Sequence, residues 1–404
     1  MDYGEFTFAN RSILNVGGTI SIASAQVKVY SADRSVRISN IKMTSSGTLE
    51  TTAKDVSIHT AEICSGTLWI HRSAKIKTLQ ICGGRLRPGR SVNVTELLIT
   101  SGDVFSSSAR PKIVARRMGW GAGRVWANDG TTAMTIQVDE RLHVFGSSSK
   151  YEEYDTVIRV NGQFTMISGG NLYMSRGAII QLNTDSTASM HHGYMRTQYN
   201  PPGRLTNMGD LTIGEYSKAT TVELAVQFQM LGKLSIKHGR IRIASGGRLS
   251  GSTELFNDGR FEVTGGTLTA TGASISGPGD LYVSGGILSL DGGEVHSPIS
   301  ITSGTLQVPT DNRVTTRGAV RIHGGTLTVD GYLECLQDVR YISGSLSGTG
   351  IVRLGNQSKI LVMSTQSSDR RTTSVRSLQI FGLLEVSSSL EVRSPGVVRN
   401  EEEG

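Results

Sequence analysis

Residues 246–346 repeat one four-residue phrase six times: Gly246-Gly247-Arg248-Leu249, Gly265-Gly266-Thr267-Leu268, Gly285-Gly286-Ile287-Leu288, Ser303-Gly304-Thr305-Leu306, Gly324-Gly325-Thr326-Leu327 and Ser343-Gly344-Ser345-Leu346. The second glycines of these copies recur at a nearly constant interval of about 19 residues. A fixed period of this kind is typical of solenoids, because a repeat this small cannot enclose a core and must stack on the next copy.

The segments between the phrases have the pattern of short β-strands. Apolar and polar residues alternate over a few positions, as in Leu268-Thr269-Ala270, Ser274-Ile275-Ser276 and Leu281-Tyr282-Val283. No window shows the spacing of an amphipathic helix. We therefore predict an all-β fold, namely a single-stranded parallel β-helix with coils of about 19 residues and a right-handed course.

Two apolar positions recur once in every period. One is the leucine of the phrase, and the other precedes the glycines, at Ile243, Val263, Val283, Ile301, Ile322 and Ile342. If each period is one coil, equivalent residues stack at the strand spacing of ~4.8 Å and form two continuous ladders in the interior. Glycine suits the corner before the strand, because it adopts positive φ without penalty. A flexible linker, the alternative for a chain with 49 glycines, lacks such regular apolar ladders.

The spacing of the phrase divides the chain. Copies in the first quarter are Gly17-Gly18-Thr19-Ile20, Ser46-Gly47-Thr48-Leu49, Ser65-Gly66-Thr67-Leu68, Gly83-Gly84-Arg85-Leu86 and Ser101-Gly102-Asp103-Val104. The first interval, from Gly18 to Gly47, is the longest and indicates a coil with an outward loop or a copy that has lost the phrase. We predict N-terminal coils at 1–104, irregular coils with longer loops of the same solenoid at 105–203, regular coils at 204–396 and a disordered acidic tail at 397–404.

Two of the three cysteines stand at equivalent positions of neighbouring repeats. Cys64 and Cys82 each directly precede one copy of the phrase, and these copies are consecutive. We therefore predict that they lie one above the other, at a separation that permits a disulfide. We favour two stacked free thiols and leave a disulfide as the alternative. The third cysteine, Cys335, and the absence of a cysteine framework leave the redox compartment open.

The sequence contains fragments of a polysaccharide-hydrolase pattern. Asn183-Thr184-Asp185 and His192-Gly193 match parts of it, but the paired Asp-Asp and the Arg-Ile-Lys of polygalacturonase-type enzymes are missing. Hydrolysis with inversion needs two carboxyl groups on either side of a water molecule. His191 and His192 are unsuited to one metal ion, since adjacent side chains of an extended segment point to opposite sides. We therefore expect no catalytic residues, no metal and no cofactor.

The strongest candidate for a polar binding cluster lies within 105–203, where the regular recurrence of the phrase is interrupted. Arg116, Arg117 and Arg124 stand near Trp120 and Trp126, and aromatic rings beside guanidinium groups suit sugar faces or anionic chains. These five residues are our candidate ligand-binding site. The structural alternative is that the tryptophans plug the solenoid.

One stretch resembles a known class of repeat. It comprises Leu205-Thr206-Asn207-Met208-Gly209-Asp210-Leu211-Thr212-Ile213, Gly232-Lys233-Leu234-Ser235-Ile236 and Gly239-Arg240-Ile241-Arg242-Ile243. It is similar to the Asn-x-Gly-x-Leu coils of very long bacterial cell-surface proteins and to autotransporter passenger domains, whose repeats read Gly-Gly-Thr-Leu-x-Val. The resemblance covers residues 205–350 and implies an extended stalk or adhesive surface. The cysteines and the higher arginine content depart from that bacterial pattern.

Composition favours solubility and a weak attraction to polyanions. The chain carries 41 Lys and Arg against 34 Asp and Glu, a net charge of +7, and these residues are spread along its length. That balance suits polysaccharide or other polyanionic surface ligands and gives no specific nucleic-acid signature.

No stretch approaches the roughly 18 apolar residues of a membrane span, and the N-terminus lacks a signal-peptide pattern. We expect part of a larger chain, located outside the cell or on its surface. Its expected function is that of a non-enzymatic, elongated stalk with an adhesive surface. The alternative is a carbohydrate-active β-helix enzyme with its site in the loops of 105–203.

Overall fold

The computed structural model shows a parallel β-solenoid. The described residues are 5–8, 14–30, 35–106, 110–127, 133–167, 170–215, 220–356, 358–362, 371–373, 377–380, 383–386, 391–392 and 398–400. Over these residues the chain forms strands and no helix, in about 16 turns with about 21 residues between stacked strands. The predicted fold class is confirmed, with a coil slightly longer than the predicted one because loops lengthen some of the turns.

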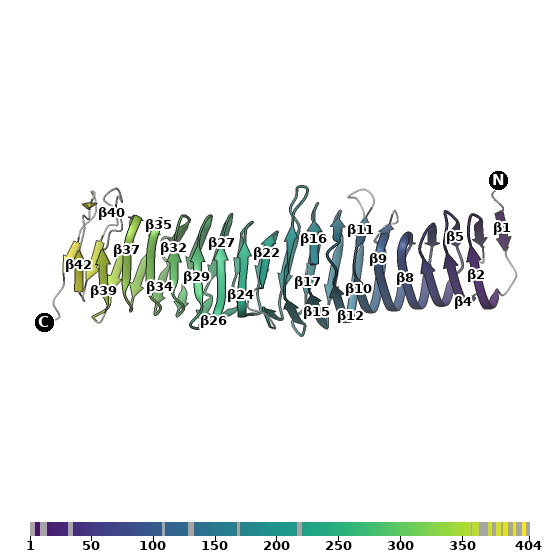
Figure 1. The fold of residues 1–404 in the computed structure, drawn as a ribbon, viewed down its shortest axis with the longest axis horizontal. Coiled ribbons are helices and arrows are strands. Elements are labelled where there is room, and N and C mark those ends of the chain that lie inside the picture. Colours follow the sequence, from purple (N-terminus) through teal and green to yellow (C-terminus); the bar gives the residue numbers. More distant parts are fainter. Residues whose placement is uncertain are drawn as a thin grey trace. The chain divides into compact units, whose positions relative to one another are not determined.

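The coils divide into two compact units. Unit 1 comprises residues 1–188 and 192–209, and unit 2 comprises residues 189–191 and 210–404. Figure 1 shows the strands of unit 1 in purple to teal and those of unit 2 in teal through green to yellow. Each unit is described by itself below.

The strands of unit 1 stack in three rows. Long strands bend once, so that their two halves supply the first and second rows: β2 (Asn15–Ile22), β4 (Ser35–Met43), β6 (Asp55–Ile63), β8 (Ser73–Pro88), β9 (Ser91–Ser106), β10 (Lys112–Trp120) and β12 (Thr135–Val144). Separate strands then take these places: β14 (Val157–Val160), β15 (Gln163–Met166), β17 (Ile179–Leu182), β18 (Thr187–Met190), of which only the first two residues belong to unit 1, and β20 (Arg204–Asn207). The ends of β8 and β9 enter the third row with β1 (Glu5–Phe8), β3 (Gln26–Val29), β5 (Thr48–Thr51), β7 (Thr67–Ile70), β11 (Gly123–Ala127), β13 (Ser149–Glu153), β16 (Gly170–Met174) and β19 (Gly193–Arg196).

Unit 2 is built in the same way. Its first strands are β21 (Asp210–Ile213), β22 (Thr221–Ala225), β23 (Gln227–Met230), β24 (Lys233–Ile243), β25 (Gly247–Leu249), β26 (Ser252–Val263), β27 (Thr267–Thr271), β28 (Ser274–Ser276), β29 (Asp280–Val283), β30 (Ile287–Asp291), β31 (Gly293–Val295) and β32 (Ile299–Ile301). They continue as β33 (Thr305–Val308), β34 (Arg313–Thr316), β35 (Val320–Val329), β36 (Tyr332–Cys335), β37 (Val339–Ser347), β38 (Ile351–Leu354), β39 (Lys359–Val362), β40 (Arg371–Thr373), β41 (Ser377–Ile380), β42 (Leu383–Val386), β43 (Glu391–Val392) and β44 (Val398–Asn400).

The expected leucine ladder forms the interior of unit 2. Leu268, Leu288, Leu306, Leu327 and Leu346 pair in sequence from coil to coil, and each is at most 7% exposed. The first copy is out of step: Leu249 is buried, but it pairs with Ala270 instead of the predicted Leu268. A slip by two positions keeps the leucine inside, since side chains of a strand alternate between its faces.

The second ladder is confirmed except at its last member. Ile243, Val263, Val283, Ile301 and Ile322 stack in order, but Ile322 pairs with Tyr341 instead of the predicted Ile342. The register shifts just after Ile322, and Tyr341 is the buried residue while Ile342 is half-buried. The hydroxyl of Tyr341 donates to the carbonyl oxygen of Gly344 at 2.9 Å, which satisfies its polar end in the interior.

The stacked corner positions require glycine, because a side chain there would clash with the backbone of the neighbouring coil. Gly266 and Gly286 have φ of 62° and 63°, in the left-handed region. A Cβ atom on Gly286 would lie 2.6 Å from the carbonyl carbon of Gly265 in the coil beside it. The phrase therefore carries glycine both for the turn and for the close approach of two backbones.

The N-terminal ladder starts later than predicted. Leu49, Leu68, Leu86 and Val104 stack as expected, but the partner before Leu49 is Val27. Ile20 pairs with Ile41 in another row, so the first copy of the phrase does not mark a ladder position.

The segment 105–203 keeps the parallel pairing of its neighbours. Val125 pairs with Val104 on one side and with Glu152 on the other, and part of the extra length of this coil is a bulge where β12 pairs with β10. At the other end of the chain, β44 pairs with β41 within the expected acidic tail, and residues 397 and 401–404 lie outside the described residues.

Candidate functional site

A surface groove of about 590 Å³ follows the bend between the first and second rows of unit 1. Two lines of outward side chains border it. The flank line consists of Arg37, Ser57, Lys75 and Asn93, and the bend line consists of Ser39, His59, Lys77, Thr95 and Arg116. The residues between the lines, such as Ile58 and Ile76, point inward and are buried, so their two sequence neighbours both face solvent.

The groove is long and narrow because every coil contributes the same positions. It is lined from Asn15 on β2 to Asp139 on β12, through successive coils of unit 1. At the strand spacing of ~4.8 Å, the groove spans about 30 Å along unit 1. A site of this shape suits a linear ligand better than a compact one.

The groove is strongly cationic. Arg37, Lys75, Lys77 and Arg116 are exposed along it, and Asp139 is the one carboxylate among the described residues that line it, so the charges of these five side chains sum to +3. Among the described residues, no carboxylate lies within ion-pair distance of Arg37, Lys75 or Lys77. These three charges are therefore open to an external anion.

The cations stand on alternate coils. Arg37 pairs with Ser57 and Ser57 with Lys75, so two strand spacings, or about 10 Å, separate the two charged residues. Lys77 and Arg116 are likewise two coils apart on the bend line. Ser57, Asn93 and Thr95 stand between the charges and offer hydroxyl and amide groups to a bound chain.

A carboxylate marks the far end of the groove. Asp139 accepts hydrogen bonds from Nε2 of Gln137 at 2.7 Å and from Nδ2 of Asn161 at 2.8 Å, which fix its side chain on the surface. Its negative charge would repel a polyanion at this point. The cationic part of the groove therefore ends at Arg116.

The structure separates the five residues of the predicted ligand site. Arg116 and Arg117 lie at the bend, where both contact the carboxylate of Glu140, and Nε of Arg117 is 3.0 Å from Oε2. The hydrogen bond from Arg116 is the main reason why the pKa of Glu140 is lowered. Arg124 and Trp126 lie on β11 in the third row, so this pair is not part of the groove.

The prediction for Trp120 is wrong. Its side chain is 0% exposed and stacks between Ile99 and Val144 in the interior. It shares its strand face with the buried Met118, and therefore it fills the solenoid, as the structural alternative proposed. A residue in this position cannot contact a surface ligand.

Arg124 and Trp126 belong to a stacked column of side chains. Trp126 lies parallel to Phe105 with ring centroids 5.4 Å apart, and the guanidinium of Arg87 lies 3.9 Å from the ring centroid of Trp69 and 5.7 Å from that of Phe105. Arg124 donates to Asp103 at 3.0 and 3.2 Å, and these bonds raise its pKa. Because neighbouring side chains cover the ring faces, the column stabilises the stack of coils.

The residues of the hydrolase pattern do not form a site. Asp185 lies in the turn before β18 and His192 in the bend after it, so an extended strand separates them. The neighbouring His191 has its Nε2 2.9 Å from Oγ of Ser189, and Ser189 also lies 3.3 Å from Oε2 of Glu215. This is not the geometry of a catalytic triad, in which the carboxylate would bind the histidine and leave the serine hydroxyl to the base.

Among the described residues of unit 1, the ionisable side chains of Lys150 and Glu152 are completely buried, and sequence reasoning missed both. Glu152 and Lys150 on β13 are 0% exposed. Nζ of Lys150 donates to the carbonyl oxygens of Gly146 and Ser148 at 3.1 and 2.7 Å, and burial lowers its pKa to about 8.

The carboxylate of Glu152 has no such support. Neither of its oxygens has a hydrogen bond of good geometry among the described residues. Burial raises the pKa of Glu152 well above the usual value, and a weak contact with the Ile158 N–H opposes this rise only in part. It occupies the ladder position between Val125 and Met174, where the pattern calls for an aliphatic residue. In the sequence, Glu152 belongs to the acidic run at 152–155, so the alternation of inward and outward residues on β13 could not be recognised there.

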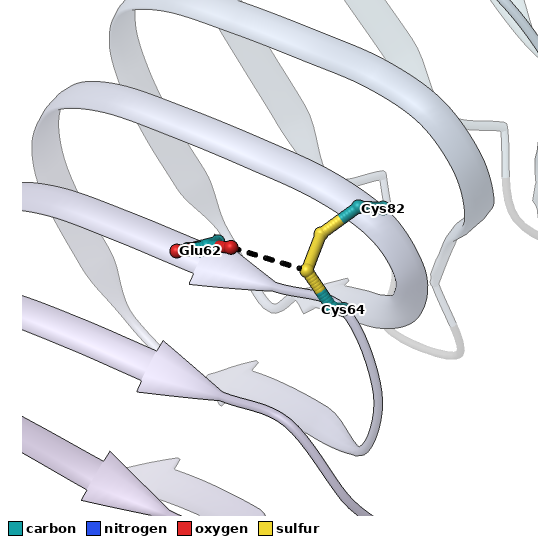
Figure 2. Close-up of side chains that lie close together, drawn as sticks. All are labelled: Glu62, Cys64 and Cys82. Atoms are coloured by element: carbon teal, nitrogen blue, oxygen red, sulfur yellow. Dashed lines mark hydrogen bonds between the residues drawn. A yellow bond between two sulfur atoms is a disulfide. The ribbon is translucent and has the colours of Figure 1, made fainter.

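Cys64 and Cys82 stack as predicted, but they form a disulfide. Their Cα atoms are 4.2 Å apart and the sulfur atoms are bonded (Figure 2). The favoured interpretation of two free thiols is therefore wrong, and the alternative holds. The bond joins neighbouring coils that backbone pairing already brings together, so it fastens β6 to β8 at their shared corner. Cys335 is free and buried, and burial raises its pKa to about 11.

No model of a known protein family, no curated protein and no solved structure matches this chain. Among the described residues, no helix is long and apolar enough to cross a membrane. The assignment of function therefore depends on the chemistry of the groove.

Proposed function

We propose that this chain is a non-enzymatic β-solenoid segment of a secreted or cell-surface protein, and that it binds an acidic polysaccharide along the groove of unit 1. The observation that carries the proposal is the set of cations Arg37, Lys75 and Lys77, which form no ion pair with a described residue, in a groove of about 590 Å³. A linear polyanion that lies along it would release counterions from its own charges and gain affinity from each contact.

Acidic polysaccharide is a better candidate than nucleic acid. Proteins that bind single strands stack the bases on aromatic side chains, and the groove is lined by no Phe, Tyr or Trp. The polar residues between the cations suit sugar hydroxyl groups. An extracellular location is supported by the Cys64–Cys82 disulfide, since such bonds persist in oxidising compartments.

Charge reversal in the groove is expected to weaken binding. The double variant Lys75→Glu/Lys77→Glu should bind fluorescent polygalacturonate or heparin oligosaccharides roughly tenfold more weakly, because two exposed attractions become repulsions. For the wild type, the logarithm of the affinity should fall with the logarithm of the salt concentration, with a slope of about −2 to −3 for three or four contacts. Fluorescence anisotropy at several NaCl concentrations measures both quantities.

The matched control is Lys233→Glu/Lys237→Glu, which changes the net charge equally but lies on β24 of unit 2. It should bind as the wild type does. An equal loss in both variants would show attraction to net charge alone and would contradict a groove site. Release of unsaturated or reducing ends from polygalacturonate or alginate, with or without calcium, would overturn the non-enzymatic assignment in favour of a carbohydrate-active enzyme.

A further inference from the structure

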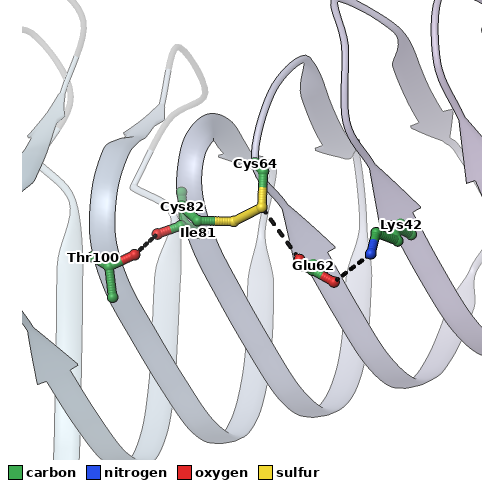
Figure 3. Close-up of a disulfide and its surroundings, with 6 residues drawn as sticks. All are labelled: Lys42, Glu62, Cys64, Ile81, Cys82 and Thr100. Atoms are coloured by element: carbon green, nitrogen blue, oxygen red, sulfur yellow. Dashed lines mark hydrogen bonds and ion pairs between the residues drawn. A yellow bond between two sulfur atoms is a disulfide. The ribbon is translucent and has the colours of Figure 1, made fainter.

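A carboxylate stands beside the disulfide at one corner of unit 1. Oε1 of Glu62 lies 3.3 Å from Sγ of Cys64, and the oxygen and both sulfur atoms lie within 4.8 Å of one another (Figure 3). All three side chains are half-buried, so solvent reaches the cluster. The cluster is on the second row and is separate from the groove at the bend.

The backbone holds the two cysteines in place independently of their bond. Residues on both sides of the cysteines are paired between the coils, Ile63 with Ile81 before them and Thr67 with Arg85 after them. The N–H of Cys64 also donates to the carbonyl oxygen of Met43 at 2.9 Å. Reduction would therefore leave two thiols stacked, and rotation about their Cα–Cβ bonds is enough to part the sulfur atoms.

We propose that the reduced form of this corner is a binding site for a thiolate-seeking divalent cation, with Zn²⁺ as the type case. Zinc binds thiolate sulfur at about 2.3 Å and carboxylate oxygen at about 2.0–2.2 Å, so tetrahedral ligands on one ion are about 3.5 Å apart. The oxygen of Glu62 already stands at nearly that distance from the sulfur of Cys64.

The second oxygen of Glu62 supports this arrangement. Oε2 lies 3.6 Å from Nζ of Lys42, on the coil before it, which leaves Oε1 free to face the sulfur atoms. Two thiolates and one carboxylate bring three negative charges to the divalent ion, and Lys42 balances the remaining charge. The fourth coordination position stays open to water.

The reaction is balanced by a dithiol reductant. The reductant gives two electrons and two protons to the Cys64–Cys82 bond, which becomes two thiols, while the reductant itself becomes a disulfide. Binding of Zn²⁺ then releases two protons as both thiols become thiolates. Metal binding and the disulfide therefore exclude each other, and the affinity should fall by up to roughly 100-fold per pH unit below the thiol pKa values.

The test uses the full chain, reduced with a phosphine and kept free of oxygen. Titration with Zn²⁺ against a chromophoric chelator should show one ion per reduced chain and none per oxidised chain. Co²⁺ in place of Zn²⁺ should give a thiolate-to-cobalt absorption band. Glu62→Gln retains both thiols and should bind Zn²⁺ at least roughly tenfold more weakly, and Cys64→Ser or Cys82→Ser should abolish tight binding.

Cys335→Ser is the matched control, because Cys335 is a buried cysteine of unit 2. It should bind one ion as the wild type does. Circular dichroism of each reduced variant establishes that the solenoid is intact. The proposal is overturned if the folded, reduced wild type takes up no zinc, or if Glu62→Gln binds with unchanged affinity. Failure here leaves polysaccharide binding by the groove unaffected.

Discussion

Replacing Leu288 by aspartate is expected to unfold the coils around it in unit 2. Leu288 is 0% exposed and stacks between Leu268 and Leu306. Truncation of a buried leucine to alanine already costs about 2–5 kcal/mol. An unpaired carboxylate in the same place adds several kcal/mol of desolvation. Denaturant unfolding should show a loss of at least about 4 kcal/mol, and hydrogen exchange should accelerate first in β27, β30 and β33.

The same substitution one residue earlier provides the control. Ile287 points outward between Thr267 and Thr305 and is half-exposed, so Ile287→Asp should cost only about 1 kcal/mol, mainly through poorer strand propensity. If the two variants were equally stable, the leucines could not form the interior ladder.

Replacing Glu152 by methionine is expected to stabilise unit 1 at neutral and alkaline pH. The substitution restores an apolar residue to the ladder between Val125 and Met174 and removes a buried carboxyl group whose oxygens have no hydrogen bond of good geometry among the described residues. Replacing buried charged groups by apolar residues of similar size typically gains about 1–4 kcal/mol. The variant should therefore raise the free energy of unfolding at pH 8 by about that amount.

The stabilisation expected from Glu152→Met depends on pH. Because the pKa of Glu152 is raised in the folded state, its contribution to stability is fully present below the ordinary glutamate pKa and is lost as pH rises through the raised value. The stability of the variant relative to the wild type should therefore increase from pH 4 to pH 8. Glu153→Met, which removes a carboxyl group from the outward side of β13 and leaves Glu152 in place, is the matched control. A Glu152→Met protein less stable than the wild type at pH 8 would contradict the account.

The fold was predictable from the sequence because one geometric requirement repeats. Each coil needs glycine at a crowded corner and an aliphatic residue just after it, and this requirement leaves a visible period. The errors occur where the register shifts. Leu249 slips by two positions against Ala270, and a shift after Ile322 brings Tyr341 inward in place of Ile342. Spacing between markers cannot reveal a bulge that lies between them.

The groove was not predictable in the same way. Arg37 and Lys75 come from different repeats, as do Lys77 and Arg116, so no local motif contains the cations together. In the sequence, each of these cations is an ordinary outward-facing residue. Only the register between coils shows that they lie in line. Trp120 is the opposite case. The local cluster of arginine and tryptophan residues suggested a surface site, but the side chain of Trp120 faces the interior.

The cysteine pair lies between these cases. Equal offsets from the phrase correctly placed Cys64 above Cys82, because stacking follows directly from the period. Spacing cannot distinguish a bond from two thiols at the same separation. The nearby carboxylate of Glu62 also escaped notice, although it stands just before Cys64 in the sequence and on the same side of the chain.

Lysine footprinting tests polysaccharide binding in the groove most directly. The protein is acetylated briefly with and without saturating polygalacturonate, and each lysine is quantified by mass spectrometry. Lys75 and Lys77 should be protected several-fold, whereas Lys42 on the second row and Lys233 in unit 2 should react equally in both samples. Uniform protection of all four, or protection that spares Lys75 and Lys77, would contradict the groove as the binding site.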